Sequence, residues 1–132
     1  FWFLPSFHSK IIVRVTIPQA GRVKLTAAQV VEQRRREDGD FNYKLTKRVS
    51  KTLSLSESAK LRSSIATARL SEVAPTACGR GGLDGDTWII ETVAAGQYHY
   101  INRWVPEKGE VRTIGTELAR LVGWQRDIAR YQ

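Results

Sequence analysis

Alternation between apolar and polar residues is the feature that most restricts how this chain folds. Apolar side chains recur at alternate positions in three successive runs, over residues 11–17, 23–31 and 41–49, with Gln29 and Lys47 as the exceptions. A period of two is typical of β-strands, because successive side chains point to opposite faces of a sheet. Turn residues at 18–21 and a charged segment at 34–40, with Asp-Gly near its end, separate the runs. The sequence therefore predicts three antiparallel strands in a meander.

A helix is expected after the meander. Leu61 and Ile65 recur at helical spacing, and Ser56 is expected to cap the first turn. Glu57 follows this cap, where a negative charge complements the positive end of the helix dipole. The helix is predicted to end near Val73, because a proline follows two residues later.

The remainder of the chain predicts a hairpin and a second helix. Alternating runs at 87–93 and 98–105 flank Ala95-Gly96, a pair suited to a tight turn. Apolar residues between 111 and 122 recur at helical spacing, and the glycine that follows supplies a stop. The predicted order is β-β-β-α-β-β-α. This is an α+β fold, an antiparallel sheet of about five strands with two helices packed on one face.

Size and composition set broad limits on the class of protein. The 132 residues predict a single domain spanning 1–132, and no apolar run approaches the ~18 residues of a transmembrane helix. Cys78 is the only cysteine, which excludes an internal disulfide and a cysteine-rich zinc site. The residues leave the localisation unknown, with export or a periplasmic location expected if an upstream signal or anchor segment was removed.

The net charge of +8 is concentrated in the first half of the chain. Residues 1–75 hold 14 Lys and Arg against six Asp and Glu, whereas residues 76–132 are neutral. Such an imbalance suits either an anionic partner or a surface that merely keeps the protein soluble. A nucleic-acid interpretation would use a hairpin tip and one face of the next strand, namely Arg34, Arg35, Arg36, Lys44 and Arg48. Alternation predicts that Lys44 and Arg48 share a face.

The most informative residues lie between 81 and 106. They form a Gly-Leu-Asp-Gly loop, a strand with Trp and Glu, and a strand with Tyr-His followed by Arg-Trp-Val-Pro. This pattern resembles the signature of a family of uncharacterised bacterial proteins, and Phe7-His8 with the basic strand after it extends the resemblance over most of the chain. The family has Ser where this chain has Val105, and the resemblance implies no activity. The matching residues are Gly82, Leu83, Asp84, Gly85, Trp88, Glu91, Tyr98, His99, Arg103, Trp104 and Pro106.

The register of the predicted hairpin decides which of these residues share a face. With a two-residue turn at 95–96, Glu91 and His99 lie on opposite faces. With a three-residue turn at 95–97, Glu91 shares a face with His99 and Arg103, next to the acidic loop. Alternation alone does not choose between the two registers. Such a cluster would be a recognition site, an acid–base pair, or a cross-strand ion pair that only fixes the hairpin.

Other familiar sites do not occur in the sequence. The glycine-rich stretch at 79–82 lacks the lysine and the following helix of a phosphate-binding loop. Asp84 and Asp86 are too few for a calcium loop, and His8 and His99 lack the spacing of metal ligands. No Gly-x-Ser-x-Gly elbow is present. We therefore expect no catalytic residue, no metal site and no cofactor.

These observations favour a non-enzymatic bacterial module that binds another protein. An inhibitor or immunity-type neutraliser of a secreted effector is one form of this hypothesis. Trp, Tyr and Arg commonly anchor protein interfaces, and the residues expected to contact the partner protein are Arg80, Asp84, Asp86, Trp88, Glu91, His99, Arg103 and Trp104. Nucleic-acid binding by the basic half is the alternative. An enzyme that uses Glu91 and His99 as an acid–base pair ranks third.

Overall fold

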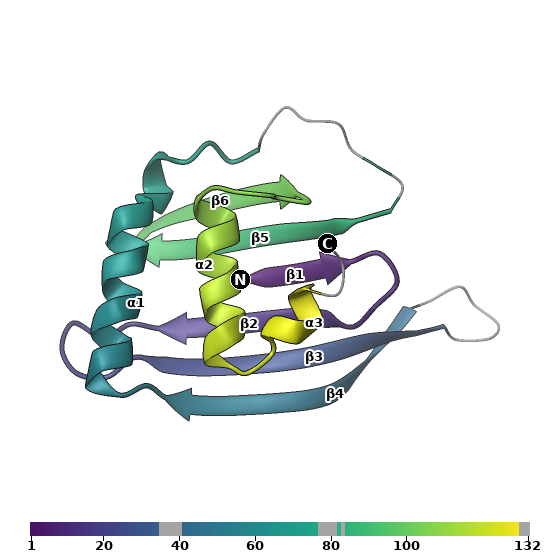
Figure 1. Cartoon of the computed structure of the whole chain (residues 1–132), viewed down its shortest axis with the longest axis horizontal. Helices are drawn as coiled ribbons and strands as arrows, with labels where there is room; N and C mark the ends of the chain where they lie inside the picture. Colours follow the sequence, from purple (N-terminus) through teal and green to yellow (C-terminus); the bar gives the residue numbers. More distant parts are fainter. Residues whose placement is uncertain (35–40, 77–81, 83, 130–132) are drawn as a thin grey trace.

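Six antiparallel strands form one sheet in the computed structural model, which describes residues 1–34, 41–76, 82 and 84–129 (Figure 1). In chain order they are β1 (Trp2–Pro5), β2 (Lys10–Thr16), β3 (Lys24–Arg34), β4 (Phe41–Thr52), β5 (Asp86–Ala94) and β6 (Gln97–Trp104). Across the sheet their order is β4-β3-β2-β1-β5-β6. The predicted α+β class and the predicted strands are confirmed. The Asp38-Gly39 turn lies outside the described residues.

Strand β1 was not predicted, yet it lies near the middle of the sheet. Trp2 pairs with Ile12 of β2 on one side and with Ile89 of β5 on the other. The strand therefore joins the predicted meander to the predicted hairpin. Four residues are too few to display a period of two, and Pro5 lacks the N–H that a strand interior uses. Only pairing with distant segments identifies residues 2–5 as a strand.

Helices cover one face of the sheet, which we call the inner face. In Figure 1, α1 (Leu55–Ala68), α2 (Glu110–Leu121) and α3 (Gln125–Ala129) all lie in front of the sheet. A short 3₁₀ turn, η1 (Leu70–Glu72), follows α1. Two helices were expected, and α3 adds a third whose single turn is too short to show a helical period. The opposite face, which we call the outer face, carries no helix among the described residues.

The first helix is capped and terminated differently from the prediction. Ser54, rather than Ser56, is the cap: its Oγ accepts the Glu57 N–H at 3.1 Å, and the Glu57 carboxylate accepts the Ser54 N–H at 2.9 Å. This reciprocal pair satisfies two backbone donors that the first turn leaves free. At the other end Arg69 adopts a left-handed φ of 45°, so the helix stops there instead of continuing to Val73.

The core lies between the inner face and the helices. Alternate residues of the strands are buried there, including Phe3 of β1 and Trp88 of β5. The facing side of α2 buries the stripe that its helical spacing predicted, which consists of Val111, Ile114, Leu118 and Leu121. Burial of these side chains explains why the inner face is apolar, but it does not explain the residues of the outer face.

Candidate functional site

The β5–β6 hairpin adopts the two-residue turn. Ala95 and Gly96 both have positive φ, 50° and 76°, as a type I′ turn requires. The resulting register places His99 and Arg103 on the inner face and Glu91 on the outer face. The three-residue register is therefore wrong, and the Glu-His-Arg cluster that it allowed does not form.

His99 and Arg103 hold the segment after η1 against the edge strand β6. The His99 Nε2 atom lies 2.9 Å from the carbonyl oxygen of Val73. The Arg103 guanidinium donates to the carbonyl oxygens of Ala74, at 2.7 Å, and Pro75, at 3.3 Å. Backbone carbonyls in an irregular segment need such partners. Both side chains thus have a structural role in this arrangement.

Asp86 and Trp88 lie in the core at the start of β5, with exposed fractions of 2% and 0%. The Arg112 guanidinium lies 4.9 Å from the centre of the Trp88 ring. Burial raises the pKa of Asp86, and the nearby Trp88 N–H and the Arg112 charge offset part of that rise. The Asp86 Oδ1 atom and the Trp88 indole N–H form no well-directed hydrogen bond with any described residue. Neither side chain is accessible to a partner.

Trp104 packs on the glycine loop that precedes β5. A Cβ on Gly85 would lie 2.6 Å from the Trp104 ring, and one on Gly82 would lie 3.5 Å from it. Position 85 therefore requires glycine because the indole approaches its backbone so closely, whereas the distance at Gly82 is an ordinary van der Waals contact. The Trp104 ring is 37% exposed, and Asp84 of the same loop is also exposed. Arg80 lies outside the described residues.

The centre of the outer face is apolar. We call this patch the outer apolar band, and it consists of six side chains from five strands: Trp2, Leu4, Ile12, Val30, Leu45 and Ile89. The outward side of a one-sided antiparallel sheet is ordinarily polar. Here Trp2 lies between Ile12 and Ile89, and Val30 lies beside Leu45. Ala28 lies opposite Ile12 and Lys10 opposite Val30, between these two groups of apolar side chains. Leu45 is exposed, the other five side chains are half-buried, and no described helix covers them.

The sequence carried a signal for this band that alternation alone obscured. Residues 11–13 and 88–90 are each three consecutive apolar residues. In a strand, three such residues in a row make both faces apolar, because the middle one points away from its neighbours. Ile12 and Ile89 are those middle residues, and both belong to the outer apolar band.

Aromatic and charged side chains border the band. On the β5–β6 side, the Glu91 carboxylate accepts hydrogen bonds from the Tyr98 hydroxyl at 2.7 Å and from the Trp2 indole N–H at 2.5 Å. Tyr100 lies directly opposite Glu91 in the register. On the β2–β4 side, the outer face carries three exposed cations, which are Arg14, Lys24 and Arg48. None of the three forms an ion pair with another described residue.

The basic residues of β4 do not share one surface. Strand β4 has one extra residue, Thr46, where the pairing with β3 shifts register. The bulge reverses the alternation, so Lys44 lies on the inner-face side and Arg48 on the outer face. The prediction that these two residues share a face is therefore wrong. Arg34 is the last residue of β3. Arg35 and Arg36, the other two arginines predicted to contact nucleic acid, lie outside the described residues.

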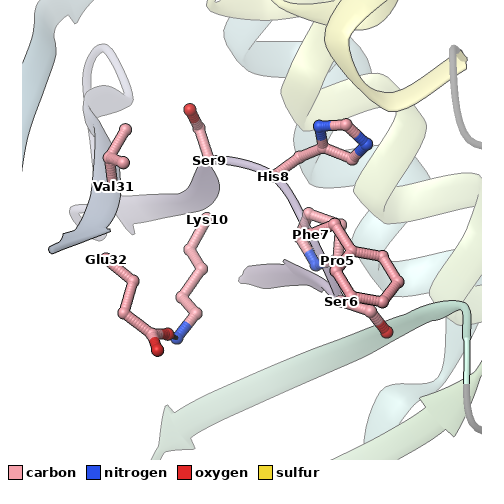
Figure 2. A pocket seen from close by; sticks show the side chains of 8 residues that line it. All are labelled: Pro5, Ser6, Phe7, His8, Ser9, Lys10, Val31 and Glu32. Atoms are coloured by element: carbon pink, nitrogen blue, oxygen red, sulfur yellow. Dashed lines mark hydrogen bonds and ion pairs between the residues drawn. The ribbon is translucent and has the colours of Figure 1, made fainter. Parts of the chain in front are cut away.

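A cavity of about 340 Å³ lies at the connection between β1 and β2 (Figure 2). Figure 2 shows Ser6 and Phe7 on one side and Lys10 with Glu32 on the other. The Lys10 Nζ atom lies 2.9 Å from a Glu32 carboxylate oxygen, and this hydrogen bond raises the pKa of Lys10. The two charges neutralise each other, and the lining includes none of the residues predicted as site residues.

Within the described ranges, no three His, Cys, Asp or Glu side chains gather as metal ligands. No helix of the described chain is both long enough and apolar enough to cross a bilayer. Comparison with protein-family models, curated proteins and solved structures finds no match for this chain. The outer apolar band makes the outer face the candidate functional site.

Proposed function

We propose that this chain is a non-enzymatic module that binds another protein through the outer face of its sheet. The observation that carries this proposal is the outer apolar band. Contiguous apolar surface is unfavourable in water and commonly marks an interaction site. An antiparallel sheet with one covered face has no need of apolar side chains on the other. A docked partner would remove them from water.

The composition of the face suits a protein better than a nucleic acid. Five of the six side chains of the outer apolar band are aliphatic and offer no ring on which bases could stack, Trp2 being the exception. Apolar centres bordered by Trp, Tyr and Arg are typical of protein interfaces. The three exposed cations on the β2–β4 side favour a partner with acidic side chains around its apolar patch. An inhibitor or immunity-type neutraliser would use such a face to cover its effector.

The test compares how much partner protein the tagged wild type and two matched variants capture from a lysate of the protein's own cells. Leu45→Glu places a charge in the outer apolar band, where the side chain is 50% exposed. Leu55→Glu places the same charge on α1, where the side chain is 65% exposed and lies on the helical side of the molecule. We expect wild type and Leu55→Glu to retain one stoichiometric protein through a wash at about 0.5 M salt, and Leu45→Glu to lose it.

Three results would contradict the proposal. The first is equal capture by Leu45→Glu and Leu55→Glu, provided that urea unfolding shows both variants to be folded. The second is nucleic acid that co-purifies at low salt and leaves in the wash, because phosphate contacts weaken steeply with salt. The third is self-association as the sole interaction, which sedimentation of the purified chain would detect.

A further inference from the structure

Glu91 is an exposed carboxylate bordered by aromatic side chains from two neighbouring strands. Tyr98 and Tyr100 come from β6, and Trp2 comes from β1 on the other side of β5. The Tyr98 hydroxyl and the Trp2 indole N–H donate to different oxygens of the carboxylate. These two bonds fix the orientation of the Glu91 side chain on the outer face. Trp2 also belongs to the outer apolar band, so the carboxylate lies at the edge of that band.

The Glu91 carboxylate remains charged in this setting. The hydrogen bond from Tyr98 lowers its pKa most, and the bond from Trp2 adds to that effect. Both donors are neutral, so they stabilise the negative charge without cancelling it, and the N-terminal ammonium of Phe1 is a cation that attracts it more weakly. No Lys, Arg or His side chain among the described residues forms an ion pair with it. Glu32, the other acid on this face, differs because Lys10 neutralises it.

Docking of a partner over the outer apolar band would remove water from Glu91. An ionised carboxylate that loses water without gaining a counter-charge is strongly destabilised. A neutral apolar group from the partner would leave the charge buried and unpaired.

We propose that Glu91, bordered by Trp2, Tyr98 and Tyr100, receives a Lys or Arg side chain of the docked partner, an inference that rests on the proposed function. The partner then carries a cation at the β5–β6 end of its contact surface and acids at the β2–β4 end. This opposite placement of charge orients the partner on the sheet.

The first experiment uses a small probe and needs no identified partner. N-acetyl-arginine methylamide is titrated into the ¹⁵N-labelled chain, and the indole N–H signal of Trp2, assigned with Trp2→Phe, is followed. The citrulline counterpart, which has the same shape without the charge, is the matched probe. We expect the arginine probe to shift this signal about two- to fivefold more than the citrulline probe, because an ion pair with an exposed carboxylate adds only a modest free energy. Equal responses to both probes, or no response to either, would overturn the inference.

Matched acid variants complete the test. Glu91→Gln keeps the side-chain shape and removes the charge, and Glu32→Gln makes the same change at the neutralised acid. We expect Glu91→Gln to abolish the excess response to the arginine probe and to weaken partner capture about tenfold, with Glu32→Gln close to wild type. Partner capture that Leu45→Glu loses but Glu91→Gln keeps would overturn this inference and leave the proposed function standing. Capture that neither variant affects would count against the proposed function itself.

Discussion

Gly115 of α2 lies directly against the indole ring of Trp88 on β5. A Cβ on Gly115 would come within 2.5 Å of the Cζ3 atom of Trp88 and within 2.7 Å of the Phe1 ring. Carbon atoms do not approach so closely, so α2 reaches this position only because Gly115 has no side chain. This contact sets the spacing between the helical layer and the sheet at the centre of the core.

Gly115→Ala is expected to lower the free energy of unfolding by about 1–3 kcal/mol through overpacking, although alanine is about 1 kcal/mol the better helix former. Urea unfolding measures the change. Thr116→Ala, at the next and exposed position of α2, is the control and should be neutral or slightly stabilising. A Gly115→Ala variant as stable as the control would refute the close contact with Trp88.

The hairpin turn predicts opposite effects at its two positions. Ala95 has a φ of 50°, which asparagine tolerates better than alanine, so Ala95→Asn should stabilise the fold by about 0.5–1 kcal/mol. Gly96→Ala should destabilise it by about 1 kcal/mol because of its φ of 76°. A Cβ on Gly96 would meet no atom within 4 Å, so the loss would report backbone strain alone. Thermal unfolding that ranks the two variants in the reverse order would rule out the two-residue turn.

Arg103→Ala should release the segment at 73–76 from the edge of the sheet. The loss of charge-assisted hydrogen bonds to Ala74 and Pro75 is expected to cost about 1–2 kcal/mol. The amide of Asn102, which donates to the Pro75 carbonyl at 2.7 Å, should exchange with solvent faster. Arg126→Ala, at an exposed position of α3, is the control for loss of charge. Unchanged exchange at Asn102 would show that other contacts hold the segment.

The start of α1 should be sensitive to acid. Hydrogen bonds from the Ser54 backbone and from Lys51 lower the pKa of Glu57 from 4.5 to about 2. Because the folded-state value is the lower one, the carboxylate stabilises the fold above pH 4.5, and that contribution is lost as the pH falls towards 2. Melting temperatures of wild type and Glu57→Gln should therefore converge over this window. A difference between them that does not depend on pH would contradict this role.

Asp86 should show the opposite dependence on pH. Burial raises its folded-state pKa above 3.8, so the group favours folding most below pH 3.8 and loses that contribution as the pH rises through the raised pKa. Asp86→Asn should therefore melt at a higher temperature than wild type at neutral pH, with a gain that shrinks on acidification. Asp84→Asn, at an exposed position of the same loop, is the control. A variant less stable than wild type at neutral pH, with a deficit that vanishes on acidification, would show that attraction to Arg112 outweighs burial.

The candidate site was only partly predictable from the sequence. Glu91 and Trp104 were singled out, and the structure places both on the outer face. Trp2 was missed because β1 was not recognised as a strand. Asp86 and Trp88, predicted as contact residues, are buried because their strand turns those side chains towards α2.

Local periodicity by itself determined the α+β class, the apolar stripe of α2 and the positions of five strands. Each of these depends on neighbours along the chain, which a period of two or 3.6 records. Only the tertiary structure decided the central place of β1, the face of Glu91 and the reversal of alternation at Thr46. Those features depend on register between residues far apart in sequence, and a shift of one residue exchanges the two faces of a strand.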